Sequence, residues 1–212
     1  MSDKPPIALE DRDAKKGRLF SPSAGRNKDV IADVLAETLA KNSKVLEIAS
    51  GTGEHGIAAI EKRPDLLWQF SDPDAASRVS QQAWIEHVGL ALTSPINLDV
   101  TATNWASRMG PYDAIFCANM IHIAPWAATL GLANGASACV AEGGIICLYG
   151  PFLEGEDSAP SNLDFDQSLK SRNPAWGVRD LASVKHIFAK HGFNQVTRRD
   201  MPKNNLFLLL SR

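Results

Sequence analysis

The sequence predicts an α/β fold in which a mainly parallel sheet has helices on both faces and an antiparallel last strand. Apolar strand-like segments alternate with helix-like segments along most of the 212 residues. Repeated βα units of this kind form parallel sheets that are covered by helices. Near the C-terminus, strand-like segments at 193–199 and 206–210 are joined by the short polar stretch 201–205. Such a short connection favours antiparallel pairing of the two strands.

The expected elements follow this alternation in order. Helices are expected at residues 27–41, 54–63, 75–90, 126–141 and 181–191. Strands are expected at 45–48, 66–71, 96–100, 112–118 and 145–149, before the closing pair. The first helix is amphipathic, and the apolar side chains on one face are Val30, Ile31, Val34, Leu35 and Leu39.

One domain is expected over residues 20–212. A chain of 212 residues with 44% hydrophobic content can bury a sizeable core, but it is too short for a cofactor domain plus a full substrate domain. Residues 1–19 are charged and lack an apolar run, so we expect a flexible tail without a secretory signal or membrane anchor. Residues 150–179 are polar, aromatic and too long for a simple connection, which predicts a substrate lid.

Composition argues against several partners. The net charge of −2 shows no basic excess, so nucleic acid is not an expected partner. Residues 114–141 carry no charge, but polar residues and Pro125 interrupt them, so no membrane span is expected. Cys117, Cys139 and Cys147 form no C-x-x-C pair and are expected to be buried free thiols, which favours a cytoplasmic location. The five histidines lack paired-ligand spacing, so no metal site is expected.

The most informative motif is KVLEIASGTGEHG at residues 44–56. It joins an apolar strand to a helix through a glycine loop (residues 49–53), in which Gly51 and Gly53 allow the backbone to turn and approach a ligand. Ala49 and Thr52 belong to the same loop and are expected to contact that ligand. Gly51, Gly53 and Gly56 also satisfy the G-x-G-x-x-G pattern of dinucleotide sites, so an NAD(P)-dependent oxidoreductase is an alternative.

Glu47 favours a cationic ligand over a dinucleotide. A carboxylate at the end of a strand that leads to a pyrophosphate would repel the phosphates. S-adenosylmethionine carries a sulfonium and an ammonium group, so Glu47 is expected to attract that end or to brace the loop around it. A tight strand-to-helix turn without a ligand is the simpler alternative.

Further polar residues follow the other strands, where ligands bind in parallel sheets. Asp72 is expected to accept hydrogen bonds from ribose hydroxyls, although it could instead cap the next helix, a role that Asp74 fits better. Asp99 and Val100 would contact adenine, unless Asp99 is only a turn residue. Asn119 and Met120 follow the fourth strand and are expected to shape the cofactor pocket.

His122 is the candidate reacting group, because imidazole acts as a general base near neutral pH. Local packing or capping is an equally weighted alternative. The predicted substrate pocket combines aromatic and polar side chains in or beside the lid, although for each aromatic residue taken alone core packing is favoured over substrate contact. These candidates are Tyr149, Phe152, Phe165 and Trp176, with Asn162, Asp166, Arg172 and Arg179.

From about Phe20 onward the chain resembles the methyltransferase-like 26 group, a family of class I S-adenosylmethionine-dependent methyltransferase-like proteins. The motifs that carry the resemblance are LEIASGTGEHG, SDPD, LDV, ANMIHIAPW, LYGPF, SNLDFDQSL and NPAWGVRDL. The resemblance implies a seven-stranded class I methyltransferase sheet with a reversed last strand. It also implies that Arg26 and Asn27, in FSPSAGRNK, belong to the cofactor site, where they could cover the cofactor or bind an anionic group, although Asn27 could instead cap a helix.

These observations lead to a functional hypothesis with two alternatives. The sequence is expected to encode a methyltransferase that uses S-adenosylmethionine, releases S-adenosylhomocysteine and modifies a small-molecule acceptor. Transfer from a sulfonium depends mostly on positioning, so a protein nucleophile is not required. The alternatives are a non-catalytic scaffold that binds S-adenosylmethionine, and the NAD(P)-dependent oxidoreductase.

Overall fold

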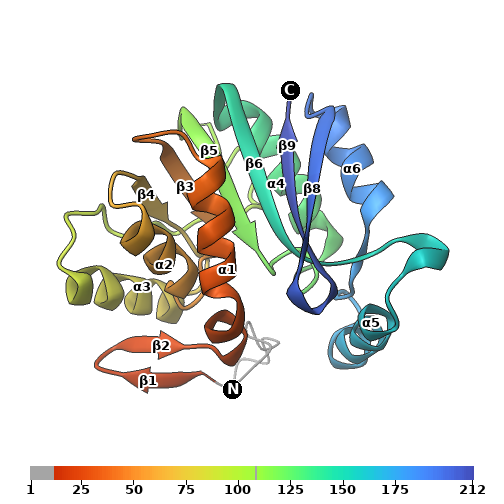
Figure 1. Ribbon diagram of the computed structural model, residues 1–212, viewed down its shortest axis with the longest axis horizontal. Coiled ribbons are helices and arrows are strands. Elements are labelled where there is room, and N and C mark those ends of the chain that lie inside the picture. The colour runs from red at the N-terminus through yellow and green to blue at the C-terminus, as the bar shows by residue number, and fades with distance from the viewer. Residues whose placement is uncertain (1–11, 108) are drawn as a thin grey trace.

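A computed structural model describes residues 12–107 and 109–212 (Figure 1). Most of the chain forms one large sheet with helices packed against it. Its strands are β3 (Lys44–Ile48), β4 (Leu67–Phe70), β5 (Tyr112–Ala118), β6 (Val140–Leu153), β7 (Arg179–Asp180), β8 (Gln195–Met201) and β9 (Asn205–Ser211). The helices are α1 (Pro22–Thr38), α2 (Glu54–Lys62), α3 (Ala75–Val88), α4 (Trp126–Cys139), α5 (Pro160–Arg172) and α6 (Leu181–Lys190). Two short 3₁₀ helices span Gly155–Asp157 and Pro202–Asn204.

The sheet has seven strands in the order β4-β3-β5-β6-β9-β8, and β7 pairs with β6 outside this path. Strands β3, β4, β5 and β6 are parallel to their neighbours in this group. Strand β9 runs antiparallel to both β6 and β8. The predicted α/β fold, with a mainly parallel sheet and a reversed last strand, is confirmed.

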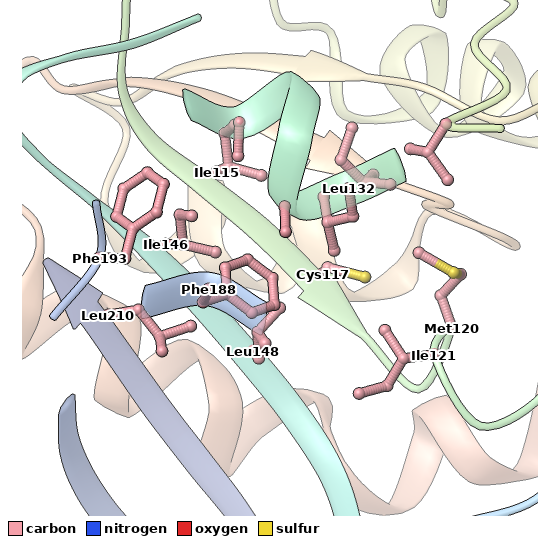
Figure 2. Close-up of a cluster of buried hydrophobic side chains, with 14 of the residues drawn as sticks. Ile115, Cys117, Met120, Ile121, Leu132, Ile146, Leu148, Phe188, Phe193 and Leu210 are labelled. Atoms are coloured by element: carbon pink, nitrogen blue, oxygen red, sulfur yellow. The ribbon is translucent and has the colours of Figure 1, made fainter. Parts of the chain in front are cut away.

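Alternation along the strands divides the core into two layers. Leu46 and Ile115 face one side of the sheet and pack with helices α4 and α6, and Figure 2 shows part of this cluster around Phe188 and Leu132. Val45 and Phe116 face the other side, where helices α1, α2 and α3 contribute the apolar side chains. Side chains at successive positions of a strand point to opposite faces, so one strand supplies both layers.

The N-terminal segment differs from the predicted tail. Residues 1–11 of that tail lie outside the described residues. From residue 13 onward the chain forms an antiparallel hairpin of β1 (Asp13–Lys15) and β2 (Arg18–Phe20). The hairpin is held on α3, because Leu19 N–H donates to Ser80 Oγ at 2.8 Å and the Phe20 ring meets Trp84 edge-on.

Helix α1 begins five residues before the predicted start. Ser21 is its N-cap, its hydroxyl accepts from Ala24 N–H, and Pro22 occupies the first turn. Proline suits this position because its missing N–H would have no helical partner there. Asn27 therefore lies inside the helix, and the alternative that it caps the helix is wrong.

The strand predicted at 96–100 is reduced to one bridge between Ser71 and Ile96. Two backbone hydrogen bonds join Ile96 to Phe70 and Asp72, but Pro95 lacks an N–H to extend the ladder. Asp99 then turns the chain by accepting from Thr101 N–H. The seventh strand of the sheet is β7 instead.

The segment predicted as a lid is folded into regular elements. Strand β6 continues to Leu153, α5 starts with Pro160 in its first turn, and β7 returns to β6. Leu169, Trp176 and Val178 form a small buried cluster of their own. Residues 150–179 therefore form a packed helical insertion after β6.

The three cysteines are free and buried, as predicted. Burial raises the pKa of both Cys117 and Cys147 to about 12, so these thiols stay protonated. Among the described residues, no helix combines the length and apolarity that crossing a membrane requires. The same residues contain no group of three or more His, Cys, Asp or Glu side chains placed to hold a metal ion.

Candidate functional site

A cavity of about 770 Å³ opens at the carboxyl ends of the parallel strands. Its wall includes residues that follow β3, β4 and β5, together with the end of β6, the start of α1 and the start of α5. Ligands of parallel sheets bind at this edge, and the volume suits a small molecule. Among the predicted site residues, the wall contains Arg26, Asn27, Ala49, Gly51, Thr52, Asp72, Asn119, Met120, His122, Tyr149, Asn162 and Phe165.

The glycine loop supplies one side of this wall. Ala49, Gly51 and Gly53 all have positive φ, at 53°, 55° and 93°, so the backbone turns sharply between β3 and α2. Gln81 Nε2 donates to the Gly51 carbonyl at 2.9 Å and fixes the loop against α3. Gly53 lies outside the wall, where it is the N-cap of α2 and packs against Gln81 and Trp84. Gly53 thus shapes the loop, and Gly51 is the glycine that faces the cavity.

Asp72 is buried beside this loop. One carboxylate oxygen accepts from Gly51 N–H at 2.9 Å, and the other accepts from Asp74 N–H at 2.9 Å. Burial raises the pKa of Asp72, against the opposing effect of these two hydrogen bonds. Each oxygen of a carboxylate has two lone pairs, so both can accept another hydrogen bond from a ligand hydroxyl. Asp74 caps α3 through Ala76 and Ser77, as its position in the sequence indicated.

Glu47 lies behind the cavity rather than on its wall. It shares the face of β3 that carries Val45, so its side chain points toward α2. Trp68 Nε1 donates to its carboxylate at 3.0 Å, and a Cβ on Gly56 would come within 2.6 Å of it. Burial raises its pKa from 4.5 to about 8, which leaves the carboxyl largely protonated at neutral pH. Direct attraction of a cation by Glu47 is therefore not what this geometry provides.

Glu54 ties the glycine loop to α1, and the sequence reasoning missed it. Its buried carboxylate accepts from Ser21 N–H at 2.8 Å and from Thr52 Oγ1 at 2.9 Å. The first of these bonds holds the start of α1 at the cavity. Arg12 was also missed; it lines the cavity and donates to Ser77 Oγ at 2.9 Å.

Three elements meet in a polar contact around Asn27. Its amide oxygen lies 2.8 Å from His55 Nε2, and its side chain also hydrogen-bonds Tyr149. Burial, followed by repulsion from Lys28, lowers the pKa of His55 to about 4, so the imidazole is neutral. His55 was not predicted from the sequence, although its position in the first turn of the helix after the glycine loop indicates that it could face the cavity. Asn27, His55 and Tyr149 join α1, α2 and β6 across the cavity wall.

Asn119 and His122 follow β5. Asn119 has a φ of 59° and donates its N–H to the Tyr149 carbonyl at 2.8 Å, which turns the chain toward the cavity. His122 is buried, its ring meets Phe165 edge-on at 5.7 Å, and its Nδ1 has no partner among the described residues. Burial and the nearby Arg179 lower its pKa to about 3. His122 is a neutral imidazole at physiological pH and offers one unpaired buried nitrogen.

Arg179 belongs to the scaffold rather than to the predicted substrate pocket. Its guanidinium donates to the carbonyls of Ile121 and Ala175 at 2.8 and 3.1 Å and lies over the Trp126 ring. These contacts hold the turn that presents His122. Asp166 is likewise occupied, because it accepts from Val178 N–H at 2.9 Å.

The remaining predicted residues also lie off the cavity wall. Asp99 is exposed in its turn, and Val100 is buried against α4, where a Cβ on Gly131 would lie 1.9 Å from the Val100 carbonyl oxygen. Phe152 belongs to the main core and Trp176 to the small cluster under α5. Arg172 is exposed at the end of α5. For these aromatic residues the core alternative is the one that the structure adopts.

Residues 18–212 match the family described as "Protein of unknown function (DUF938)", and the chain therefore belongs to this family. Its fold is similar to that of an O-methyltransferase family protein from Burkholderia thailandensis, with a TM-score of 0.77 and 15% identity over 90% of this chain and 56% of that one. The pyocyanin biosynthetic protein PhzM matches with a TM-score of 0.72 and 16% identity over 90% and 59% of the two chains. PigF, determined with SAH, matches with a TM-score of 0.73 and 14% identity over 90% and 56%.

These similarities establish the class I methyltransferase fold. The chain spans a little more than half the length of the three solved proteins.

The raised pKa of Glu47 predicts a stability that falls as pH rises. The unfolded chain loses this proton near pH 4.5 and the folded chain near pH 8, so ionisation favours unfolding between those values. Glu47→Gln keeps an acceptor for Trp68 and removes the titration. Its free energy of unfolding should exceed that of the wild type by about 1–3 kcal/mol at the upper end of this window, and by less at the lower end.

Urea unfolding at both ends of this window measures the difference. Glu61→Gln, an exposed change on α2, is the matched control and should follow the wild type. If Glu47→Gln keeps the wild-type pH dependence, the carboxyl is not held protonated.

Proposed function

We propose that this DUF938-family chain is an S-adenosylmethionine-dependent methyltransferase that acts on a small-molecule acceptor. The observation that carries the proposal is the 2.9 Å hydrogen bond from Gly51 N–H to Asp72 on the cavity wall. It fixes a carboxylate that can accept hydrogen bonds from ligand hydroxyls, next to Gly51, where the absence of a Cβ lets a ligand approach the backbone. The class I methyltransferase fold, and the SAH in the similar PigF structure, support the same assignment.

The residues present fit this cofactor. Asp72 would hold ribose hydroxyls, and Gly51 leaves space, because a Cβ there would have no neighbour closer than 3.9 Å. Asn119 and Met120 would line the opposite side, next to the end of β5. When bound, the cofactor supplies a methyl group that its sulfonium already activates. The protein then has to position the acceptor and exclude water.

His122 would receive the proton that an acceptor hydroxyl or amine releases. Its imidazole is neutral, buried and on the wall of the cavity, and its Nδ1 has no partner within the described part of the chain. A pKa of about 3 makes it a weak base in the empty cavity. This weakness favours the second candidate function, a scaffold that binds the cofactor without transferring the methyl group.

Two finer assignments belong to the same proposal. The motifs NMIHIAPW and NPAWGVRDL support membership of the methyltransferase-like 26 group. The buried free thiols support a reducing, cytoplasmic location.

Removal of Asp72 tests the cofactor site. Asp72→Ala should weaken S-adenosylhomocysteine binding at least about 100-fold, because hydrogen bonds to a charged group contribute about 1.5–3 kcal/mol each. Calorimetric titration measures the affinity, and thermal unfolding verifies that the variant folds. Asp157→Ala, on the exposed 3₁₀ turn, should bind like the wild type. Unchanged affinity in a folded Asp72→Ala protein would refute the site.

Replacement of His122 tests the proton acceptor. His122→Gln should slow methyl transfer about 100-fold or more while S-adenosylhomocysteine affinity stays within about twofold. The assay is single-turnover transfer to an acceptor found by screening hydroxylated aromatic compounds. Because the pKa of His122 in the empty cavity is about 3, its protonation should not reduce the wild-type rate at subsaturating acceptor between neutral pH and about pH 5. Full activity of the variant would show that His122 only packs.

A further inference from the structure

The charges on the cavity wall are unevenly distributed. Among the described residues, the wall contains three cationic side chains, Arg12, Arg26 and Lys203, and one carboxylate, Asp72. Arg12 lies near Gly51, on the side of the cavity that holds Asp72. Arg26 and Lys203 come from α1 and from the turn between β8 and β9, where the wall has no acidic residue. The whole chain has a net charge of −2, so this cationic region does not reflect a generally basic protein.

The turn that carries Lys203 has an unusual backbone. Lys203 and Asn204 both adopt left-handed conformations, with φ of 62° and 57°. This conformation costs a lysine about 1 kcal/mol or more, whereas asparagine adopts it more readily, and such strain concentrates at functional sites. Glycine would relieve it at position 203, yet the chain has a lysine there.

The start of α5 holds this turn at the cavity. Asn162 Nδ2 donates to the Asn204 carbonyl at 3.0 Å, and Asn204 Nδ2 donates to Ser161 Oγ at 2.9 Å. Figure 1 shows the β8–β9 turn, the start of α1 and α5 along the same edge of the sheet. The helical insertion thus holds the turn that carries Lys203 on the cavity wall.

The Lys203 ammonium and the Ser161 hydroxyl have hydrogen-bond donors to offer to a ligand. Within residues 12–107 and 109–212, no hydrogen bond or ion pair involves the Lys203 ammonium. The Arg26 guanidinium lies on the same wall and donates to Ser23 Oγ at 3.3 Å. Ser161 Oγ accepts from Asn204, so its own hydrogen can be donated to a ligand. Neighbouring Phe165 and Ile123 add an apolar surface to the same cavity.

We infer that the methyl acceptor carries an anionic group, a carboxylate or a phosphate, which Lys203 and Arg26 bind while its apolar body lies against Phe165 and Ile123. The inference rests on the proposed methyltransferase function and names its acceptor class. An anion in the cavity would also favour the charged form of His122. Binding of the acceptor would therefore strengthen the base that burial weakens.

Paired probes test the inference on the full chain. Phenylacetate, phenyl phosphate and neutral phenylacetamide share an aromatic body and differ in charge. Ligand-observed NMR titrations, with and without S-adenosylhomocysteine, should show that one anion binds at least about tenfold more tightly than the amide. Tighter binding of phenylacetate would indicate a carboxylate site, and tighter binding of phenyl phosphate would indicate a phosphate site. Lys203→Gln should reduce the preference severalfold, and the Lys203→Gln/Arg26→Gln double variant should abolish it.

The matched control is Lys185→Gln, an exposed lysine on α6 that should keep the wild-type preference. S-adenosylhomocysteine affinity should be unchanged in Lys203→Gln. Equal binding of the amide and the anions, no measurable binding of either anion, or a preference that survives in the double variant would overturn the anion site. If the wild type binds the anions selectively but does not bind S-adenosylhomocysteine, the proposed function fails and the anion site stands.

Discussion

The hydrogen bond between Gly51 and Asp72 joins the ends of two parallel strands, and the geometry of the cavity depends on it. Strands β3 and β4 are paired from Lys44 to Glu47, and the pairing continues beyond the strands through Ser50 N–H and the Ser71 carbonyl at 2.8 Å. Ser71 Oγ donates to the Glu47 carbonyl at 2.6 Å, which closes the same junction from the other side. The loop can therefore hold its positive φ angles, and its Gly51 N–H fixes the Asp72 carboxylate at the cavity.

The other walls of the cavity are held to this junction by contacts between side chains that are far apart in the sequence. Glu54 draws the N-cap of α1 to the glycine loop, and Asn27 then links α1 to α2 and β6. On the far side, Arg179 fixes the turn before α4 and so positions His122. The cavity has one half built on β3, β4 and β5, and another built from α1, β6, α5 and the β8–β9 turn. In the proposal, the cofactor binds the first half, and the acceptor binds the second half together with His122 and Ile123, which follow β5.

The fold was predictable because it follows from the alternation of apolar strands and amphipathic helices, which local sequence records directly. The positions of Asp72 and Asn119 at the cavity were predictable for a related reason, since residues after parallel strands meet at one edge. Glu47 was expected near the ligand because it lies just before the glycine loop in sequence. Side chains alternate between the two faces of β3, however, and this alternation turns Glu47 toward α2. Arg179 and Trp176 were assigned to a pocket because their residue types suit one. Arg179 instead binds the Ile121 carbonyl, 58 residues away in sequence, and Trp176 packs in the small cluster with Leu169 and Val178. Glu54 and His55 were missed because their partners, Ser21 and Asn27, are 33 and 28 residues away in sequence. Helix α5 is polar at most positions, and it packs through Leu169 and Phe165 into the small cluster that contains Trp176 and Val178.

The most direct test of the account is calorimetric titration of the wild-type protein with S-adenosylmethionine, S-adenosylhomocysteine and NADH in parallel. If the proposed function holds, both sulfur compounds should bind with near-micromolar affinity, about −8 kcal/mol, and NADH should not bind. Asp72 alone would serve either kind of adenosine ligand, so the comparison with NADH decides the cofactor class. Binding of NADH alone would contradict the methyltransferase assignment.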